Sequence, residues 1–142
     1  MSVGGAGWEH FETEADVGVH AWGASRAEAF AHAALGVFAL IVAPEEVVER
    51  EHREVRAQGD SVERLLVAWI NECLYVHEIE GFVVRRIEVD RCTETVVHGM
   101  LCGEELDLAR HRPGTVVKAA TLHQVLVAGS GGRHEVRVIV DV

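Results

Sequence analysis

Acidic residues alternate along a short stretch near the start of the chain. Glu12, Glu14 and Asp16 stand at every second position, so on a β-strand all three carboxylates would project from one face. Hard divalent cations such as Ca²⁺ and Mg²⁺ are held in proteins by several oxygen donors of this kind. A solvated outer strand face produces the same alternation, and the pattern alone leaves both interpretations open.

A second acidic group stands at the other end of the sequence. The closing segment RHEVRVIVDV alternates valine with other residues, which predicts a strand, and Asp141 has the opposite parity to these valines. The carboxylate of Asp141 and that of Val142 repel each other unless a cation or water separates them. The pair can supply two anionic donors to one ion, or it can be a frayed strand end in water.

A lysine interrupts a run of small and apolar residues in the segment VVKAATLHQV. In such a strand Lys118 must extend its ammonium group to water at the sheet edge, pair with an acid, or take part in chemistry. Thr121 and His123 share one parity and are expected to form a small polar patch. A lone histidine in a strand is more often a surface or core residue than a metal ligand.

The sequence carries no recognised catalytic signature. The motifs HExxH, GxSxG and GxGxxG and the phosphate-binding loop are all missing. Cys73 and His77 lie four residues apart on a predicted helix, but two ligands do not make a zinc site, and the other cysteines and histidines lack zinc spacing. These observations weigh against a protein that is an enzyme by itself.

Length and composition indicate one globular domain over residues 1–142, with residues 1–7 as a flexible lead-in. The formal net charge of -10 argues against strong direct binding to nucleic acid, which needs clustered lysine and arginine. The longest apolar stretch is too short to span a membrane. Three cysteines without CxxC spacing, and no signal peptide, predict a reduced, cytoplasmic protein.

Hydrophobic periodicity predicts an α+β fold with two main helices packed on a largely antiparallel β-sheet. The helices are expected over residues 25–42 and 59–81, with Ser25 and Asp60 as N-caps and Gly81 as the stop. Strands are expected over residues 11–21, 45–58, 82–91, 94–103, 115–129 and 133–142. A turn within 11–21 and a helix over 45–58 are the alternatives.

Several segments, in order and spacing, resemble the archease family. They are FETEADVGVHAWGASRAEAFAHAALGVFALI, LLVAWINECLYVHEIEGF, GEELD, VKAATLHQV and the closing VIVDV. The resemblance covers nearly the whole chain, from about residue 11 to residue 142. The fold that it implies is a small α+β protein related to the strand-helix-strand-strand modules.

The resemblance also implies a function in RNA processing without enzymatic activity. Archeases activate the RNA ligase that joins a 2′,3′-cyclic or 3′-phosphate end to a 5′-hydroxyl end in tRNA splicing and RNA repair. That ligase uses GTP and a metal and passes through a guanylylated histidine. By resemblance, the chain is expected to promote this guanylylation and repeated turnover of the ligase, and the family is also described as chaperone-like.

A divalent-cation site built from both ends of the chain is a further implication of the resemblance. Asp16 and Asp141 match the acidic residues of the family, and the terminal carboxylate of Val142 is a third donor. Oxygen donors favour Ca²⁺ or Mg²⁺, with Mn²⁺ as a further candidate, over zinc. The lysine of the family segment KAxTxH matches Lys118, which could steady an acid or contact phosphate or an acid of the ligase.

Other residues of the matched segments concern the partner surface. Thr121 and His123 complete the KAxTxH match. The family usually has His-Thr-Ala-Asp where this chain has TEAD, so Glu14 is either an additional cation ligand or part of a changed surface toward the ligase. The family segment LNE matches the INE of WINECL, where Glu72 is given no role.

Two functions of other classes stay open. A metal-dependent hydrolase could use the same acids, but no nucleophile with a paired base is evident. A cation-responsive chaperone would need an exposed apolar surface, and the sequence shows none that is obvious. The cation site requires that the aspartate of the first strand and the end of the last strand meet in space.

Overall fold

The computed structural model of the chain describes residues 5–13 and 16–142. Seven strands, two α-helices and one short 3-10 helix (η1) follow one another in these residues. In chain order the elements are β1 (Gly7–Glu12), β2 (Val17–Gly23), α1 (Arg26–Ile41), η1 (Pro44–Glu46), β3 (Glu51–Gln58), α2 (Val62–Glu80), β4 (Phe82–Cys92), β5 (Val96–Glu105), β6 (Ala119–Ser130) and β7 (Arg133–Asp141).

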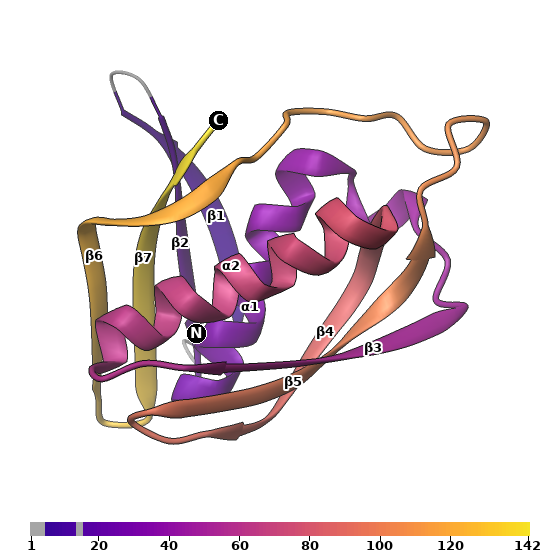
Figure 1. Cartoon of the computed structure of the whole chain (residues 1–142). Helices are drawn as coiled ribbons and strands as arrows, with labels where there is room; N and C mark the ends of the chain where they lie inside the picture. Colours follow the sequence, from indigo (N-terminus) through magenta and orange to yellow (C-terminus); the bar gives the residue numbers. More distant parts are fainter. Residues whose placement is uncertain (1–4, 14–15) are drawn as a thin grey trace.

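The strands form two antiparallel sheets with the helices packed between them (Figure 1). One sheet has the strand order β1-β2-β7-β6, and the other has the order β3-β5-β4. The α+β class and the antiparallel pairing agree with the sequence prediction. The prediction of one sheet is wrong, because the strands form two. Alternation along a strand indicates which face is buried but not which strand lies beside it.

The core lies where the helices meet both sheets. Helix α1 contacts β2, β7 and β4, and α2 contacts β6 and β3. The indole N–H of Trp69 on α2 donates a hydrogen bond of 3.0 Å to the carbonyl oxygen of Phe30 on α1. Because both residues are completely buried, this bond satisfies the one polar atom of the tryptophan side chain and fixes the contact between the helices.

One of the two predicted helix N-caps is confirmed, and the other is wrong by one residue. Ser25 caps α1 by accepting a hydrogen bond of 3.1 Å from the backbone N–H of Glu28, as expected. Helix α2 is capped by Ser61 and not by Asp60. Gly81 ends α2 in the left-handed region at φ 66°, a conformation that other residues adopt at an energetic cost.

The N-terminal strand is a hairpin of two strands. The prediction of one strand over residues 11–21 is replaced by its alternative, because β1 ends at Glu12 and β2 begins at Val17. Residues 1–4 lie outside the described residues, and Gly7, which was assigned to a flexible lead-in, pairs with Trp22. No helix in the described residues is long and apolar enough to cross a membrane.

Two other strands are shorter than predicted. Strand β3 begins at Glu51, because the preceding residues include the η1 turn at Pro44. Strand β6 begins at Ala119, and residues 111–118 form an irregular connection. The hairpin between β6 and β7 turns through Gly131 and Gly132, which have positive φ values of 61° and 80° and so explain the GSGG segment.

Candidate functional site

Strand register brings the two predicted aspartates to the same end of the four-stranded sheet. Strands β2 and β7 are antiparallel neighbours, and Val17 is paired with Val140. Asp16 directly precedes this pair and Asp141 directly follows it. Figure 1 shows that the C-terminus lies at the end of the sheet where β2 begins. Residues opposite one another on antiparallel strands project from the same face, so the register favours convergence of the two carboxylates.

Thr13, directly after β1, is hydrogen-bonded to Asp16, directly before β2. Its backbone N–H and its hydroxyl group both donate to the carbonyl oxygen of Asp16 at 3.1 Å, and its hydroxyl oxygen accepts the backbone N–H of Asp16 at 3.0 Å. Glu14, predicted as a further ligand or partner contact, lies outside the described residues. Threonine at the first position of TEAD therefore fixes the backbone of the aspartate itself.

Lys118 is connected to the acidic end through its backbone. Its N–H donates a hydrogen bond of 2.8 Å to the carbonyl oxygen of Asp141. The next residue, Ala119, is paired with Asp141, so the side chains of these two share a face and that of Lys118 belongs to the opposite parity. Lys118 is exposed, so its ammonium group can extend into solvent at the sheet edge.

Thr121 and His123 have different surroundings in the structure. The hydroxyl group of Thr121 donates a hydrogen bond of 3.0 Å to the carbonyl oxygen of Ile139 in the neighbouring strand. The strand register shifts after Thr121, and Gln124 has a positive φ of 53° within this irregular segment. His123 is exposed there, so the assumption of continuous alternation is wrong for this part of β6.

Asn71 positions the start of β6, a role that the sequence analysis missed. Its side-chain oxygen accepts the backbone N–H of Ala120 at 2.7 Å, and its side-chain amide donates to the carbonyl oxygen of the same residue at 3.4 Å. Strand β6 is an edge strand, so these groups would otherwise lack a sheet partner. The match of INE to the family segment LNE was the available signal, while the neighbouring Glu72 is exposed.

Replacing Asn71 by alanine is expected to lower the free energy of unfolding by about 1–2 kcal/mol, because a backbone donor and an acceptor lose their partner. Urea denaturation measures this loss, and Glu72→Ala is the matched control on the same helix, with an expected change below about 0.5 kcal/mol. Equal stability of the two variants would contradict the role given to Asn71.

A buried carboxylate anchors the connection that leads to Lys118. Glu104 at the end of β5 is 2% exposed. It accepts hydrogen bonds from the backbone N–H of Val48 at 2.7 Å, from Arg50 at 3.0 Å, from Arg110 at 2.5 and 3.2 Å, and from His111 at 3.0 Å. His111 is also buried, and its Nδ1 accepts the backbone N–H of Asp107. Glu104 thereby ties the start of the β5–β6 connection to the three-stranded sheet.

The hydrogen bonds to Glu104 change its acidity. Those from the Arg110 guanidinium have the largest effect and, with the N–H groups of Val48 and His111, they lower the pKa of Glu104 to about 2, while burial acts in the opposite direction. The carboxylate is therefore charged at neutral pH. The sequence segment GEELDLARHR contains three of these groups, but only the fold shows that they converge.

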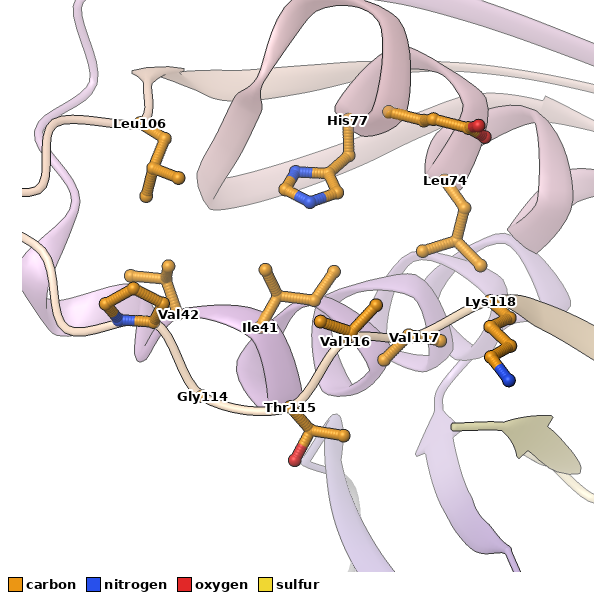
Figure 2. A pocket seen from close by; sticks show the side chains of 12 residues that line it. Ile41, Val42, Leu74, His77, Leu106, Gly114, Thr115, Val116, Val117 and Lys118 are labelled. Atoms are coloured by element: carbon orange, nitrogen blue, oxygen red, sulfur yellow. The ribbon is translucent and has the colours of Figure 1, made fainter.

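An apolar cavity of about 450 Å³ lies beside the connection to β6 (Figure 2). Ile41 from α1, Leu74 from α2 and Val117 from the connection point toward one another across it, and Lys118 stands at one edge with its side chain leading away. The backbone N–H of Gly114 donates to the carbonyl oxygen of Ile41 at 2.7 Å. The connection thus covers the end of α1 and leaves a hollow next to α2.

Exposed apolar side chains occur on the elements that line this hollow. Tyr75 and Ile79 lie one turn apart on α2 and are 58% and 64% exposed, and Val116, which lines the hollow, is 77% exposed. The expectation that the chain has no evident exposed apolar surface is therefore wrong for this region. Cys73 and His77, which lie four residues apart on α2, have separate surroundings: Cys73 is buried, and His77 Nδ1 donates to the carbonyl oxygen of Phe82.

Comparison with proteins of known sequence identifies relatives over almost the whole chain. The model of the Archease protein family (MTH1598/TM1083) matches residues 8–142. Protein archease from Pyrococcus abyssi is 39% identical over 84% of this chain and 87% of its own length. Protein archease from Sulfurisphaera tokodaii is 35% identical over 95% of this chain and 98% of its own length.

Solved structures give the same result. The solution structure of Methanobacterium thermoautotrophicum protein 1598 has a TM-score of 0.77 and 30% identity, over 96% of this chain and 99% of its own. The crystal structure of an archease from Thermotoga maritima, titled a possible chaperone, shares the fold with a TM-score of 0.54 and 20% identity, over 94% of this chain and 96% of its own. With a family match that covers all but the first seven residues, this chain is a member of the archease family.

Proposed function

We propose that this protein activates an RNA ligase without being an enzyme itself. The ligase class joins a 3′-phosphate or 2′,3′-cyclic phosphate end to a 5′-hydroxyl end, as in tRNA splicing and RNA repair. The protein promotes guanylylation of the ligase histidine from GTP and allows the ligase to turn over repeatedly. Membership of the archease family supports this proposal.

The observation that carries the proposal is the register of β2 and β7. Asp16 directly precedes Val17 and Asp141 directly follows Val140, so the pairing of these two valines supports a site shared by the two aspartates, although 124 residues separate them in the sequence. Hard divalent cations bind such oxygen donors, and a terminal oxygen of Val142 can serve as a third. The donors fit Ca²⁺, Mg²⁺ or Mn²⁺, which when bound would offset negative charge that develops on phosphate oxygens.

The residues around the acidic pair have supporting roles in this proposal. Thr13 is hydrogen-bonded to the backbone of Asp16, and Asn71 is hydrogen-bonded to the backbone at the start of β6. Lys118, exposed on the opposite face, contacts a phosphate or an acidic side chain of the ligase. The ligase surface that receives this end is expected to be basic, since the chain has a formal net charge of -10.

The experiment that tests the proposed function measures guanylylation of the ligase with labelled GTP. At substoichiometric amounts, this protein is expected to raise the rate of guanylylation and to convert a single ligation turnover into many. Chelation of divalent cations from this protein before mixing is expected to remove the effect, and adding Ca²⁺ or Mg²⁺ back should restore it. Unchanged guanylylation in the presence of the protein would contradict the proposal.

A second candidate function, a cation-responsive chaperone, is favoured by the exposed apolar side chains beside the cavity. Tyr75, Ile79 and Val116 offer apolar contacts to an unfolded client. This function predicts that the protein suppresses aggregation of unrelated proteins and that Asp141→Ala leaves the suppression intact. A metal-dependent hydrolase would instead cleave phosphate esters when the isolated protein is supplied with metal.

A further inference from the structure

A thiol, an imidazole and a carboxylate lie together on the outer face of the three-stranded sheet, and the cysteine is distant in sequence from the other two residues. Cys102 lies in the central strand β5, and its position is paired with His52 on β3 on one side and with Arg86 on β4 on the other. Glu49 reaches the same place from the segment before β3. One donor atom from each of Cys102, His52 and Glu49 lies within 4.8 Å of the other two.

We propose that Glu49, His52 and Cys102 form a binding site for zinc or a similar transition-metal ion. The site is distinct from the acidic end of the other sheet, and it stands independently of the proposed function. Thiolate and imidazole ligands favour zinc over the hard cations that bind oxygen donors alone. Three protein ligands leave a fourth tetrahedral position for water.

The distances are compatible with metal binding after small side-chain movements. His52 Nε2 lies 3.6 Å from Glu49 Oε1. Ligand atoms around a tetrahedral zinc ion are roughly 3.3–3.8 Å apart, given metal-ligand distances of about 2.0–2.3 Å. A spread of up to 4.8 Å thus has to contract by about 1 Å. His52 and Glu49 are exposed and can make this movement, whereas Cys102 is 1% exposed and held by its central strand.

Arg86 orients the carboxylate of the proposed site. It donates hydrogen bonds of 2.6 Å and 3.2 Å to the two oxygens of Glu49, and it also pairs with Glu88 at 2.8 Å. Outer groups of this kind fix the ligands around a metal. On binding, the thiol of Cys102 releases its proton to solvent. The thiolate, Glu49 and Glu88 then carry three negative charges and Arg86 carries one positive charge, and the divalent ion offsets the difference.

The Cys102 side chain is almost completely removed from water. Removal from water has the largest effect and raises the pKa of the Cys102 thiol, while Arg86 acts in the opposite direction. The alternative explanation of the cluster is that the ion pairs of Arg86 with Glu49 and Glu88 lie beside a cysteine that binds nothing. It differs from a metal site because it predicts no specific uptake of a thiophilic ion.

Titration of the full chain with Co²⁺ in reducing buffer tests the proposal, because cobalt bound to a thiolate gives a near-ultraviolet charge-transfer band and visible bands of tetrahedral geometry. The wild-type protein is expected to develop both bands with one ion per chain, and Zn²⁺ should bleach them. Cys102→Ser should abolish the charge-transfer band, and His52→Ala, a substitution at an exposed position, should weaken Co²⁺ binding at least about tenfold.

The matched controls are Cys92→Ser, which removes a cysteine outside the cluster, and Asp141→Ala, which removes an acid of the other sheet. Both are expected to retain the cobalt bands. A failure of the proposed metal site can therefore be told apart from a failure of the proposed ligase activation.

Absence of a charge-transfer band in the wild-type protein would overturn the metal site. Equal Co²⁺ affinity of the wild-type protein and His52→Ala would overturn it as well, without depending on a buried substitution.

Discussion

Replacing Asp16 or Asp141 by alanine is expected to return the guanylylation rate of the ligase to its unassisted level. Each substitution removes one of the two carboxylates proposed to share the cation, which flank the paired residues Val17 and Val140. A cation held by so few donors is expected to lose most of its affinity when one donor is removed. The initial rate of label transfer from GTP to the ligase, with limiting activator, measures the effect.

Glu12→Ala is the matched control for these substitutions. Glu12 is also an acid of the β1–β2 hairpin and is exposed. It is paired with Val17, so its side chain shares the face of Val17 and not that of Asp16, and the prediction that Glu12 and Asp16 project from one face of a single strand is wrong. The control should stimulate the ligase as the wild-type protein does. Circular dichroism should show the same thermal transition for all variants, since Asp141 is exposed and no large apolar contact is removed. Wild-type stimulation by both aspartate variants would refute the cation mechanism.

Replacing Glu104 by glutamine is expected to cause the largest loss of stability. The neutral side chain leaves Arg110 and the buried His111 without the carboxylate that accepts their hydrogen bonds. Because the arginines that contact Glu104 are partly exposed and can be rehydrated, we expect a loss of about 2–3 kcal/mol rather than the full cost of a buried unpaired charge. Chemical denaturation at neutral pH measures it, with the exposed Glu105→Gln as control.

The pH dependence gives an independent check of the same carboxylate. The pKa of Glu104 is lowered in the folded protein from 4.5 to about 2, so the stabilisation is fully present above about pH 4.5 and is lost as the pH falls toward 2. Over this range the wild-type protein should lose stability more steeply than Glu104→Gln. Parallel stability curves for the two proteins, or a loss at neutral pH no larger than that of Glu105→Gln, would contradict the role of Glu104.

The sequence predicted the local elements better than their assembly. Side-chain periodicity and capping residues placed α1 and most strands within a few residues, because both depend on neighbours along the chain. The assignment of Asp60 in place of Ser61 as a cap arose because adjacent residues are both good caps, and only the backbone conformation selects one. The division into two sheets depends on long-range pairing, which alternation does not encode.

The same limit explains which site residues the sequence could indicate. Asp16, Asp141 and Lys118 were found through segments that resemble the archease family, and the register now gives a physical reason for Asp16 and Asp141 to be neighbours. Asn71 and the cluster around Cys102 were missed, because their contacts join a helix to a strand edge or three strands across a sheet. Residues that meet in this way have no fixed spacing in the sequence.

Calorimetric titration with Ca²⁺ tests the central claim most directly, namely that Asp16 and Asp141 share one hard cation. Calcium is the appropriate probe because it prefers oxygen ligands and has little affinity for a thiolate site. The wild-type protein is expected to bind a single Ca²⁺ ion. Asp16→Asn and Asp141→Asn should each weaken Ca²⁺ binding at least about tenfold, whereas His52→Ala should bind Ca²⁺ as the wild-type protein does. Wild-type Ca²⁺ affinity in both asparagine variants would contradict the account.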